Sequence, residues 1–152
     1  MPTNTQPRLS ARALVAHEGR LLLVNATPDK GDGKWCVPGG GVDAGRSLKD
    51  NVIREVYEET GLTVEIGDIA TISEFYDPVS GFHQVDLFFH ASVQDAALPE
   101  SWRDCADVVE HRGFFSPEDM EDMIVLPEFL KQPFWLDGQK TCSIYQGWHE
   151  KT

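Results

Sequence analysis

Apolar and polar residues alternate with a period of about two over residues 63–76 and 82–93, and this pattern predicts two long β-strands. Short apolar-rich segments bounded by turn residues predict further strands at residues 9–16, 20–24, 35–37 and 108–115. Turn-forming residues join the two segments nearest the N-terminus at His17-Glu18-Gly19 and the two longest segments at residues 77–81, so each of these pairs predicts a β-hairpin.

One segment between these strands has the period of a helix instead. Leu48, Val52 and Val56 recur at helical spacing. Ser47 is a suitable N-cap in front of them, and Gly61 can end the helix in the left-handed conformation. The pattern therefore predicts a helix that begins after Ser47 and ends before Gly61.

Two later segments predict shorter helices. The first begins at Ser116-Pro117-Glu118, where proline occupies the first helical position, and the second covers residues 127–136. The order along the chain is thus strands, helix, strands, helix. This order predicts an α+β fold, arranged as an α/β/α sandwich around a mixed β-sheet.

Length and charge restrict the kinds of protein that the chain can be. A chain of 152 residues can bury one core, so we expect a single domain over residues 1–152. The formal net charge of −12 disfavours a nucleic-acid polymer as a partner, because the phosphate backbone is itself an anion. A small anionic substrate is still compatible with this charge if a divalent metal reverses the local field.

Cysteine spacing and hydropathy indicate the compartment. Cys36, Cys105 and Cys142 show no C-x-x-C spacing, which fits a reducing environment. No apolar run approaches the roughly 20 residues that span a bilayer, so we expect a cytoplasmic protein with no membrane association. The chain also lacks a P-loop and a G-x-S-x-G elbow, which argues against P-loop kinases and serine hydrolases.

Three glutamates on the predicted helix are the strongest chemical signal. Glu55, Glu58 and Glu59 are spaced i, i+3 and i+4, so their side chains project from one face and repel one another. A divalent cation removes this repulsion, although a glutamate-rich helix alone is usually a solvated surface. Residues 39–41 are three glycines shortly before the helix, and glycine lets the backbone approach a ligand closely. The combination is more specific than either feature.

These residues resemble the box of the Nudix (MutT-like) hydrolase family, G-x5-E-x7-R-E-U-x-E-E-x-G-U, where U is aliphatic. The positions that match are Gly40, Arg54, Glu55, Val56, Glu58, Glu59, Gly61 and Leu62. Residues 35–40 and 113–118 are similar to the family's segments before the box and at its late strand. The resemblance covers about residues 9–123 and implies a Nudix-type sandwich with a mixed sheet.

The resemblance also implies an activity, namely hydrolysis of a nucleoside diphosphate linked to another group, with Mg²⁺ as cofactor and Mn²⁺ as a substitute. By position, Glu58 and Glu59 would bind the metal, and the carbonyl group of Gly39 would complete its coordination. Glu55 would be a further ligand or the residue that activates water, and Arg54 would orient the glutamates through charge-assisted hydrogen bonds. Many relatives form homodimers, so a homodimer is compatible with the resemblance.

Other residues are candidates for the general base and for substrate binding. Family members differ in which carboxylate takes the proton of water, and Glu110 is the candidate on a later loop. Phe75, Tyr76 and Phe82 are candidates for stacking on a base, with a place in the core as the alternative. Lys34, and also Arg12, could contact phosphate groups or simply be solvated. Nucleoside triphosphates, ADP-ribose, nucleotide sugars and dinucleoside polyphosphates all fit the pattern.

Arg46 departs from the box, which has a glutamate at this position. In one interpretation Arg46 turns to solvent or contacts a substrate phosphate, and Asp43 or Asp50 supplies the missing negative charge beside Arg54. In the other, the chain is a nucleotide-binding or sensing module that cleaves poorly. A purely structural interaction protein would explain the fold but not the glutamates together with the glycines.

Overall fold

The computed structural model of the chain describes residues 6–25, 33–104, 111–136 and 143–152. Its strands are β1 (Arg8–His17), β2 (Arg20–Asn25), β3 (Lys34–Cys36), β4 (Gly39–Gly41), β5 (Val64–Tyr76), β6 (His83–Val93), β7 (Arg112–Phe115), β8 (Ile124–Val125) and β9 (Tyr145–Glu150). The α-helix α1 covers Leu48–Thr60, and two short 3₁₀ helices, η2 (Glu128–Lys131) and η3 (Pro133–Trp135), follow β8.

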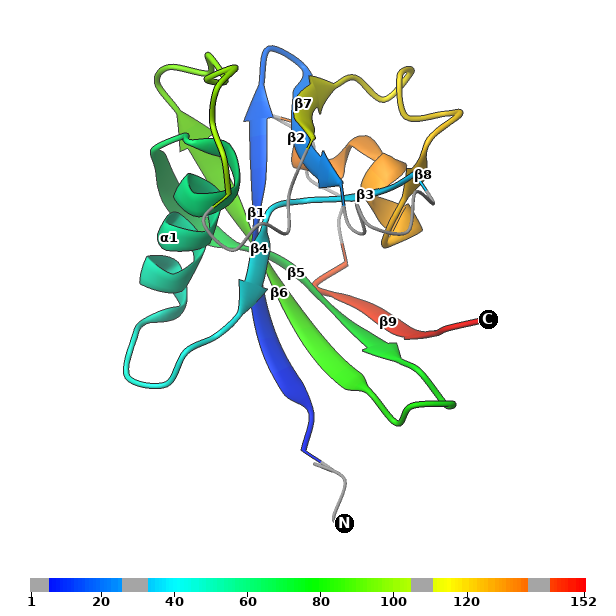
Figure 1. Cartoon of the computed structure of the whole chain (residues 1–152). Helices are drawn as coiled ribbons and strands as arrows, with labels where there is room; N and C mark the ends of the chain where they lie inside the picture. The colour runs from blue at the N-terminus through cyan, green and yellow to red at the C-terminus, as the bar shows by residue number, and fades with distance from the viewer. Residues whose placement is uncertain (1–5, 26–32, 105–110, 137–142) are drawn as a thin grey trace.

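The described strands form one curled, mixed sheet in the order β8-β3-β2-β1-β6-β5-β9, with β4 beside β1 and β7 beside β2 (Figure 1). Strand β1 runs parallel to β6, β3 to β8, and β5 to β9. The remaining pairs are antiparallel, including both hairpins predicted from the sequence. The prediction of a mixed sheet is therefore confirmed.

Strand β1 belongs to two parts of the sheet. Its last residues pair with β2 through a turn at Glu18 and Gly19, which both have positive φ (49° and 75°), as a tight hairpin turn requires. Its earlier residues pair with β6 on one side and with β4 on the other. Because β2 pairs only with the end of β1, the edge of β1 from Ser10 to Arg12 is left for the glycines of β4.

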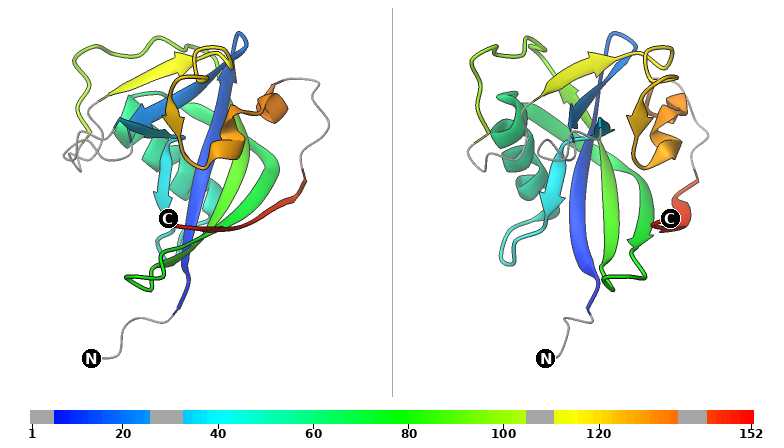
Figure 2. Two further views of the ribbon diagram at one scale, coloured as in Figure 1. Left: turned by 90° about the vertical axis from the view of Figure 1, so that its right-hand side faces the viewer. Right: turned by 45° about the vertical axis from the view of Figure 1, so that its right-hand side comes forward.

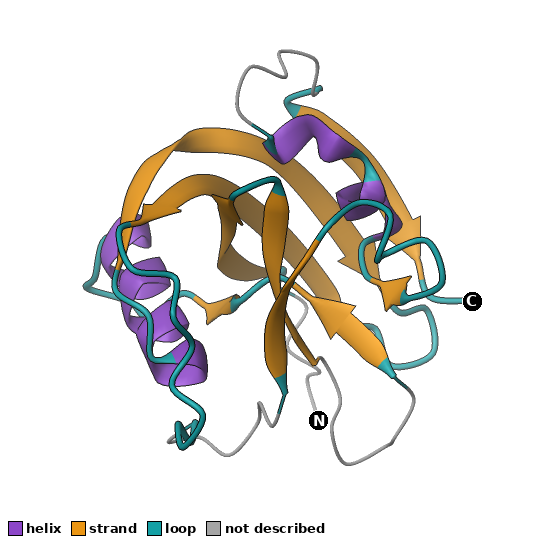
Figure 3. Ribbon diagram, turned by 90° about the horizontal axis from the view of Figure 1, so that it is seen from above, coloured by secondary structure: helices purple, strands orange, loops and turns teal. Residues whose placement is uncertain are grey.

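Two apolar clusters pack on opposite faces of the sheet. Val52 and Val56 of α1 lie against Ala11 and Phe89 on one face, and each buried valine contributes roughly 1.5–3 kcal/mol. The cluster on the other face contains Leu21 and Leu23 of β2, Val125 of β8, and Leu130 and Phe134 of the 3₁₀ helices. Figure 3 shows α1 and the 3₁₀ helices on either side of the curled sheet. The α+β fold class is confirmed.

Helix α1 begins and ends where the sequence predicts. The backbone N–H of Asp50 donates to the hydroxyl oxygen of Ser47 (3.1 Å), which satisfies an amide that the helix leaves free. At the other end Gly61 has φ 78°, and its N–H donates to the carbonyl oxygen of Tyr57 (2.8 Å). Local capping therefore fixes both helix ends, and with them the positions of the glutamates.

The C-terminal third differs from the sequence-based prediction. Residues 117–122 form turns and not a helix: Ser116 and Asp119 cap the segment through reciprocal hydrogen bonds (2.9 and 3.1 Å), but the backbone then continues with i→i−3 bonds, such as Met123 N–H to Met120 O (3.0 Å), which do not build an α-helix. The predicted helix over residues 127–136 is split into η2 and η3 at Gln132, which is extended (ψ 132°) before Pro133.

Strand β9 was not predicted, since its exposed residues lack an apolar face; it lies parallel to the outer edge of β5 (Figure 2). Only Arg112–Phe115 of the predicted strand 108–115 is seen, because residues 108–110 lie outside the described part of the chain. Within the described residues, every helix is too short or too polar to cross a membrane.

Candidate functional site

The glycine strand β4 lies directly against β1, with Gly39 opposite Arg12 and Gly41 opposite Ser10. Gly39 has φ 151°, and a Cβ atom at this position would collide with the backbone of Ala11 and with Arg12. Only glycine fits such a close approach of two backbones. The three glycines thus form a short strand, which brings the start of the box against β1.

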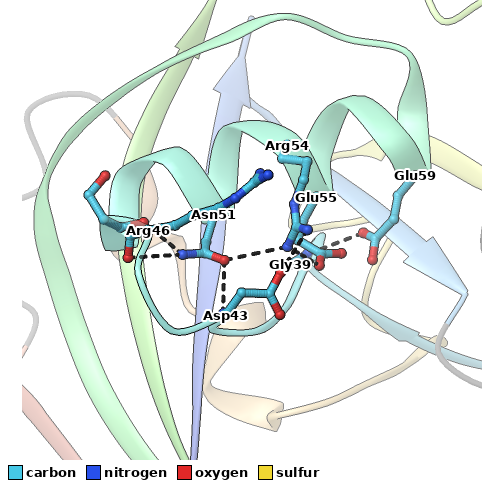
Figure 4. Close-up of polar contacts among 8 residues, drawn as sticks. Gly39, Asp43, Arg46, Asn51, Arg54, Glu55 and Glu59 are labelled. Atoms are coloured by element: carbon cyan, nitrogen blue, oxygen red, sulfur yellow. Dashed lines mark hydrogen bonds and ion pairs between the residues drawn. The ribbon is translucent and has the colours of Figure 1, made fainter.

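Glu59 is the most buried of the three glutamates. Its carboxylate accepts a hydrogen bond from the N–H of Gly39 (3.1 Å), as Figure 4 shows, and its residue is only 9% exposed. Burial raises the pKa of Glu59 to about 8, against the lowering effects of the Arg12 charge and of the Gly39 hydrogen bond. Such a carboxylate gains most from a nearby cation, because that cation offsets the cost of burying its charge.

Glu55 lies one turn earlier on α1 and faces the same glycines. A Cβ atom on Gly40 would lie 3.1 Å from the Glu55 carboxylate, so the missing side chain leaves the carboxylate beside the backbone. Burial raises the pKa of Glu55, and the negative charge of Glu58 raises it further. Glu58 is itself partly exposed. The structure therefore places the predicted glutamates along one side of the helix, in electrostatic contact.

Arg54 has an acidic partner despite the substitution in the box. Its guanidinium lies 2.8 Å from the carboxylate of Asp43 and 3.3 Å from that of Glu55 (Figure 4). Asn51 fixes this arrangement, since its amide oxygen accepts from the N–H of Asp43 (3.0 Å) and from Arg54 (3.4 Å). Arg46 is exposed. Of the two aspartates weighed from the sequence, Asp43 supplies the negative charge beside Arg54.

Asp104 is a member of this acidic site that the sequence did not single out. It is 6% exposed, in the segment that follows β6, and its charge adds to the raised pKa of both Glu55 and Glu59. The side chain of Arg112 donates to the carbonyl oxygen of Glu59 (3.0 Å) and so connects β7 to the end of α1. The signal for Asp104 was weak, because one aspartate in an acidic loop looks solvated.

The predicted substrate residues are divided between two regions. Phe75 and Phe82 lie near each other at the far end of the β5–β6 hairpin, with ring centroids 6.2 Å apart. Tyr76 packs instead against Trp148 of β9 (5.1 Å). Lys34 is partly buried at the start of β3. The predicted base Glu110 lies outside the described residues.

Arg12, weighed as a phosphate contact, is held inside the protein. Its Nε donates to the carboxylate of Asp86 (3.0 Å), and its Nη1 donates to the carbonyl oxygen of Val37 (3.1 Å).

Among the described residues, no three His, Cys, Asp or Glu side chains already lie close enough together to hold a metal ion.

Known proteins share the sequence pattern and the fold. The chain is 28% identical over 116 residues to a Bacillus subtilis protein provisionally named ADP-ribose pyrophosphatase, covering 74% of this chain and 51% of that protein. It is 29% identical over 127 residues to the RNA pyrophosphohydrolase of Novosphingobium aromaticivorans, covering 74% of this chain and 78% of that protein. The chain spans about half the length of the Bacillus subtilis protein, and also about half that of the matching diphosphoinositol polyphosphate phosphohydrolase 2 of Homo sapiens.

Solved structures agree. The MutT protein from Methanosarcina mazei Go1 superposes with a TM-score of 0.67 and 31% identity, covering 85% of this chain and 91% of that chain. A family model described as the NUDIX domain matches residues 6–133, which include β1, the glycine strand and the whole of α1. The chain therefore belongs to the Nudix family.

Proposed function

We propose that this protein is a Mg²⁺-dependent hydrolase that cleaves a diphosphate bond in a nucleoside diphosphate linked to another group. The observation that carries the proposal is the buried carboxylate of Glu59, which lies in the last turn of α1, accepts a hydrogen bond from Gly39 and has its pKa raised to about 8. Names of relatives such as pyrophosphatase and pyrophosphohydrolase agree with this chemistry.

The donor set fits a hard divalent cation. Glu55, Glu58 and Glu59 offer carboxylate oxygens, and Gly39 offers a backbone carbonyl; these are the ligand types that Mg²⁺ prefers. Gly40 leaves space in front of the Glu55 carboxylate that any side chain would fill. Binding would require the glutamate side chains to turn toward one another, and the cation would offset the burial, and the repulsion between carboxylates, that raise the pKa values of Glu55 and Glu59.

The protein groups have separate tasks in this mechanism. When bound, Mg²⁺ would neutralise phosphoryl oxygens and make a water molecule a better nucleophile. Water attacks one phosphorus atom, the anhydride P–O bond breaks, and a carboxylate takes the proton of the water. Arg54, held by Asp43 and Asn51, orients the Glu55 carboxylate through its own hydrogen bond (3.3 Å).

Three carboxylates are candidates for the general base. Glu55 is half-buried with a raised pKa, which suits a group that must accept a proton near neutral pH. Asp104 is buried and close enough to influence Glu55 and Glu59. Glu110 stays a prediction from the sequence. Comparing the pH profile of kcat in Glu55→Gln, Asp104→Asn and Glu110→Gln would identify the base as the variant that loses the acidic limb.

The Asp43–Arg54 contact favours an active enzyme over a binding module. If Arg46 had left Arg54 without a carboxylate, the orientation of Glu55 would be lost; instead Asp43 lies 2.8 Å from Arg54. We therefore expect Arg46→Glu to change kcat only modestly. A cytoplasmic location, a single domain over residues 1–152 and a homodimer stay predictions.

A substrate panel with Mg²⁺ tests the proposal. It contains a nucleoside triphosphate, ADP-ribose, a nucleotide sugar and a dinucleoside polyphosphate, and the measurement is released phosphate, pyrophosphate or nucleotide. Turnover that is lost with a chelator and in Glu58→Gln supports the hydrolase. If the protein instead binds a nucleotide tightly without turnover, and Arg46→Glu does not bring turnover, the result would support the binding module.

A further inference from the structure

Arg8, the first residue of β1, lies across the far end of the glycine strand. A Cβ atom on Gly41 would lie 2.5 Å from Nη2 and 2.8 Å from Nε of Arg8, so the guanidinium rests directly on the Gly41 backbone. Gly41 has no positive φ, and an alanine would therefore be allowed by its backbone. The absent side chain leaves the space that the guanidinium occupies.

A chain of hydrogen bonds holds Arg8 in this position. Its Nη1 donates to the amide oxygen of Gln84 (3.3 Å), and the amide nitrogen of Gln84 donates to Asp86 (2.9 Å). The same Asp86 oxygen accepts from Nε of Arg12 (3.0 Å). Gln84 and Asp86 are 7% and 5% exposed. Buried polar side chains that satisfy one another are rigid, so Gln84 offers the exposed Arg8 guanidinium an acceptor in a fixed position.

The two arginines at the ends of this chain differ in what they leave free. The guanidinium of Arg12 donates hydrogen bonds to the carboxylate of Asp86 and to the carbonyl oxygen of Val37. Arg8 is exposed, and among the described residues Gln84 is the partner of its guanidinium. A guanidinium has five N–H donors in a planar fork that matches phosphate oxygens, so Arg8 keeps donors for a ligand.

A groove opens beside Arg8. Its volume is about 400 Å³, and its lining includes Arg8, Gly41, Val42, Phe82 and His83. This is within the range of small-molecule sites. Gly41 is two residues from Gly39, about 7 Å along an extended strand, so the groove begins roughly that far along β4 from the glycine that contacts Glu59.

We propose that Arg8 binds a phosphoryl group of the substrate that lies beyond the one held at the glutamates, with the rest of that end of the molecule in the adjoining groove. This assignment rests on the proposed function, because it extends the same site along β4. The protein carries a net charge of −12, and its acidic groups repel the phosphoryl groups of a substrate. The part of the substrate that extends beyond the metal therefore needs a fixed cation to offset this repulsion. Arg8 supplies that cation and Gly41 keeps it in place.

Two substitutions test the assignment from opposite strands. Arg8→Gln removes the cation, and Gly41→Ala displaces the guanidinium through a contact with a flexible side-chain end. For the best substrate of the panel we expect each to raise KM about tenfold, the size of one charge-assisted hydrogen bond, with kcat within about twofold of the native value. The double variant should be no worse than Arg8→Gln, because both changes remove one interaction. Arg8→Lys should recover part of the loss.

Binding separates this assignment from the proposed function. Kd values for a nucleoside mono-, di- and triphosphate with Mg²⁺ are measured by calorimetry for the native protein, Arg8→Gln and the control Arg20→Gln, whose arginine is an exposed residue of β2. We expect Arg8→Gln to weaken the di- and triphosphate and to leave the monophosphate and the control unchanged. Binding that depends on Arg8 without turnover would retain the assignment and reject the hydrolase. Three results would overturn the assignment of Arg8. They are native Kd and KM values in Arg8→Gln and Gly41→Ala, an equal loss of affinity for all three nucleotides, and no binding of the nucleotides to the native protein.

Discussion

The two ends of the glycine strand β4 face opposite charges. At Gly39 the neighbour is Glu59, a buried carboxylate whose pKa is raised to about 8. At Gly41 the neighbour is Arg8, an exposed guanidinium. A nearby cation would offset the cost of burying the Glu59 charge, whereas water can satisfy the exposed guanidinium of Arg8. The difference teaches that a backbone segment without side chains can lie against a buried carboxylate at one end and an exposed cation at the other; the proposed metal site and the proposed phosphate site both rest on this arrangement.

The largest effect is expected from removing a carboxylate at the acidic end. In Glu58→Gln we expect kcat to fall by more than about 100-fold. Residues that only hydrogen-bond to metal ligands typically cost about 10–100-fold in activity when they are removed, and loss of a direct ligand should cost more. The control is Glu65→Gln, an exposed carboxylate on β5, which should keep native activity. Steady-state assays with Mg²⁺ measure both. Equal activities would mean that the glutamates of α1 are a solvated surface.

A smaller effect is expected at the Asp43–Arg54 pair. Asp43→Asn removes the partner 2.8 Å from Arg54, so kcat/KM should fall by about tenfold as the orientation of Glu55 is lost. Adding Arg46→Glu restores a carboxylate at the box position and should return most of that loss. Because the Asp43 side chain is exposed and that of Arg54 is partly exposed, the effect of the pair on the free energy of unfolding should be under about 1 kcal/mol. If the second substitution makes the enzyme worse, Asp43 does not replace the box glutamate.

The acidic end also predicts how stability varies with pH. The pKa of Glu59 is about 8 in the folded protein, above its ordinary 4.5, so the folded state binds the Glu59 proton more tightly than the unfolded state does. In metal-free protein this contribution is complete below about pH 4.5 and is lost as pH rises through about 8. We therefore expect Tm to fall over this range.

Mg²⁺ should raise Tm most at the alkaline end, where Glu59 is ionised. Glu59→Gln, which carries no charge to bury, should flatten the metal-free curve while abolishing the response to Mg²⁺. Thermal unfolding with and without the metal measures both changes. A native curve that is flat from pH 5 to about 8 would exclude a strongly raised pKa for Glu59.

The smallest effect is expected at the start of α1. Ser47→Ala removes the hydroxyl that accepts from the N–H of Asp50 and should lower the free energy of unfolding by about 1 kcal/mol. Denaturant unfolding measures it. Activity at saturating substrate should stay native, because the glutamates lie beyond the first turn. A large loss of activity would show that fraying at Ser47 reaches Glu55.

Local features were predictable from the sequence. The caps at Ser47 and Gly61 and the face shared by the glutamates depend on neighbours within a few residues, so spacing alone gave the helix and its acidic side. The turn at Glu18 and Gly19 is likewise local.

Features that depend on distant segments were not predictable. The pairing of β4 with β1, the burial of Asp104 beside α1 and the position of Arg8 over Gly41 join residues far apart in the chain. Pro133 split a helix that the apolar pattern favoured, because the residue before a proline is restricted to extended conformations. Spacing thus predicted the helix and the face that its glutamates share, whereas the backbone segments that these glutamates meet could not be predicted.

A crystal of the protein grown with Mn²⁺, with anomalous diffraction collected for manganese, tests the metal site most directly. We predict an anomalous peak within coordination distance of the carboxylates of Glu55, Glu58 and Glu59 and near the backbone of Gly39. No peak at that position, with the three side chains directed apart into solvent, would contradict a cation site on α1 and with it the hydrolysis of diphosphates.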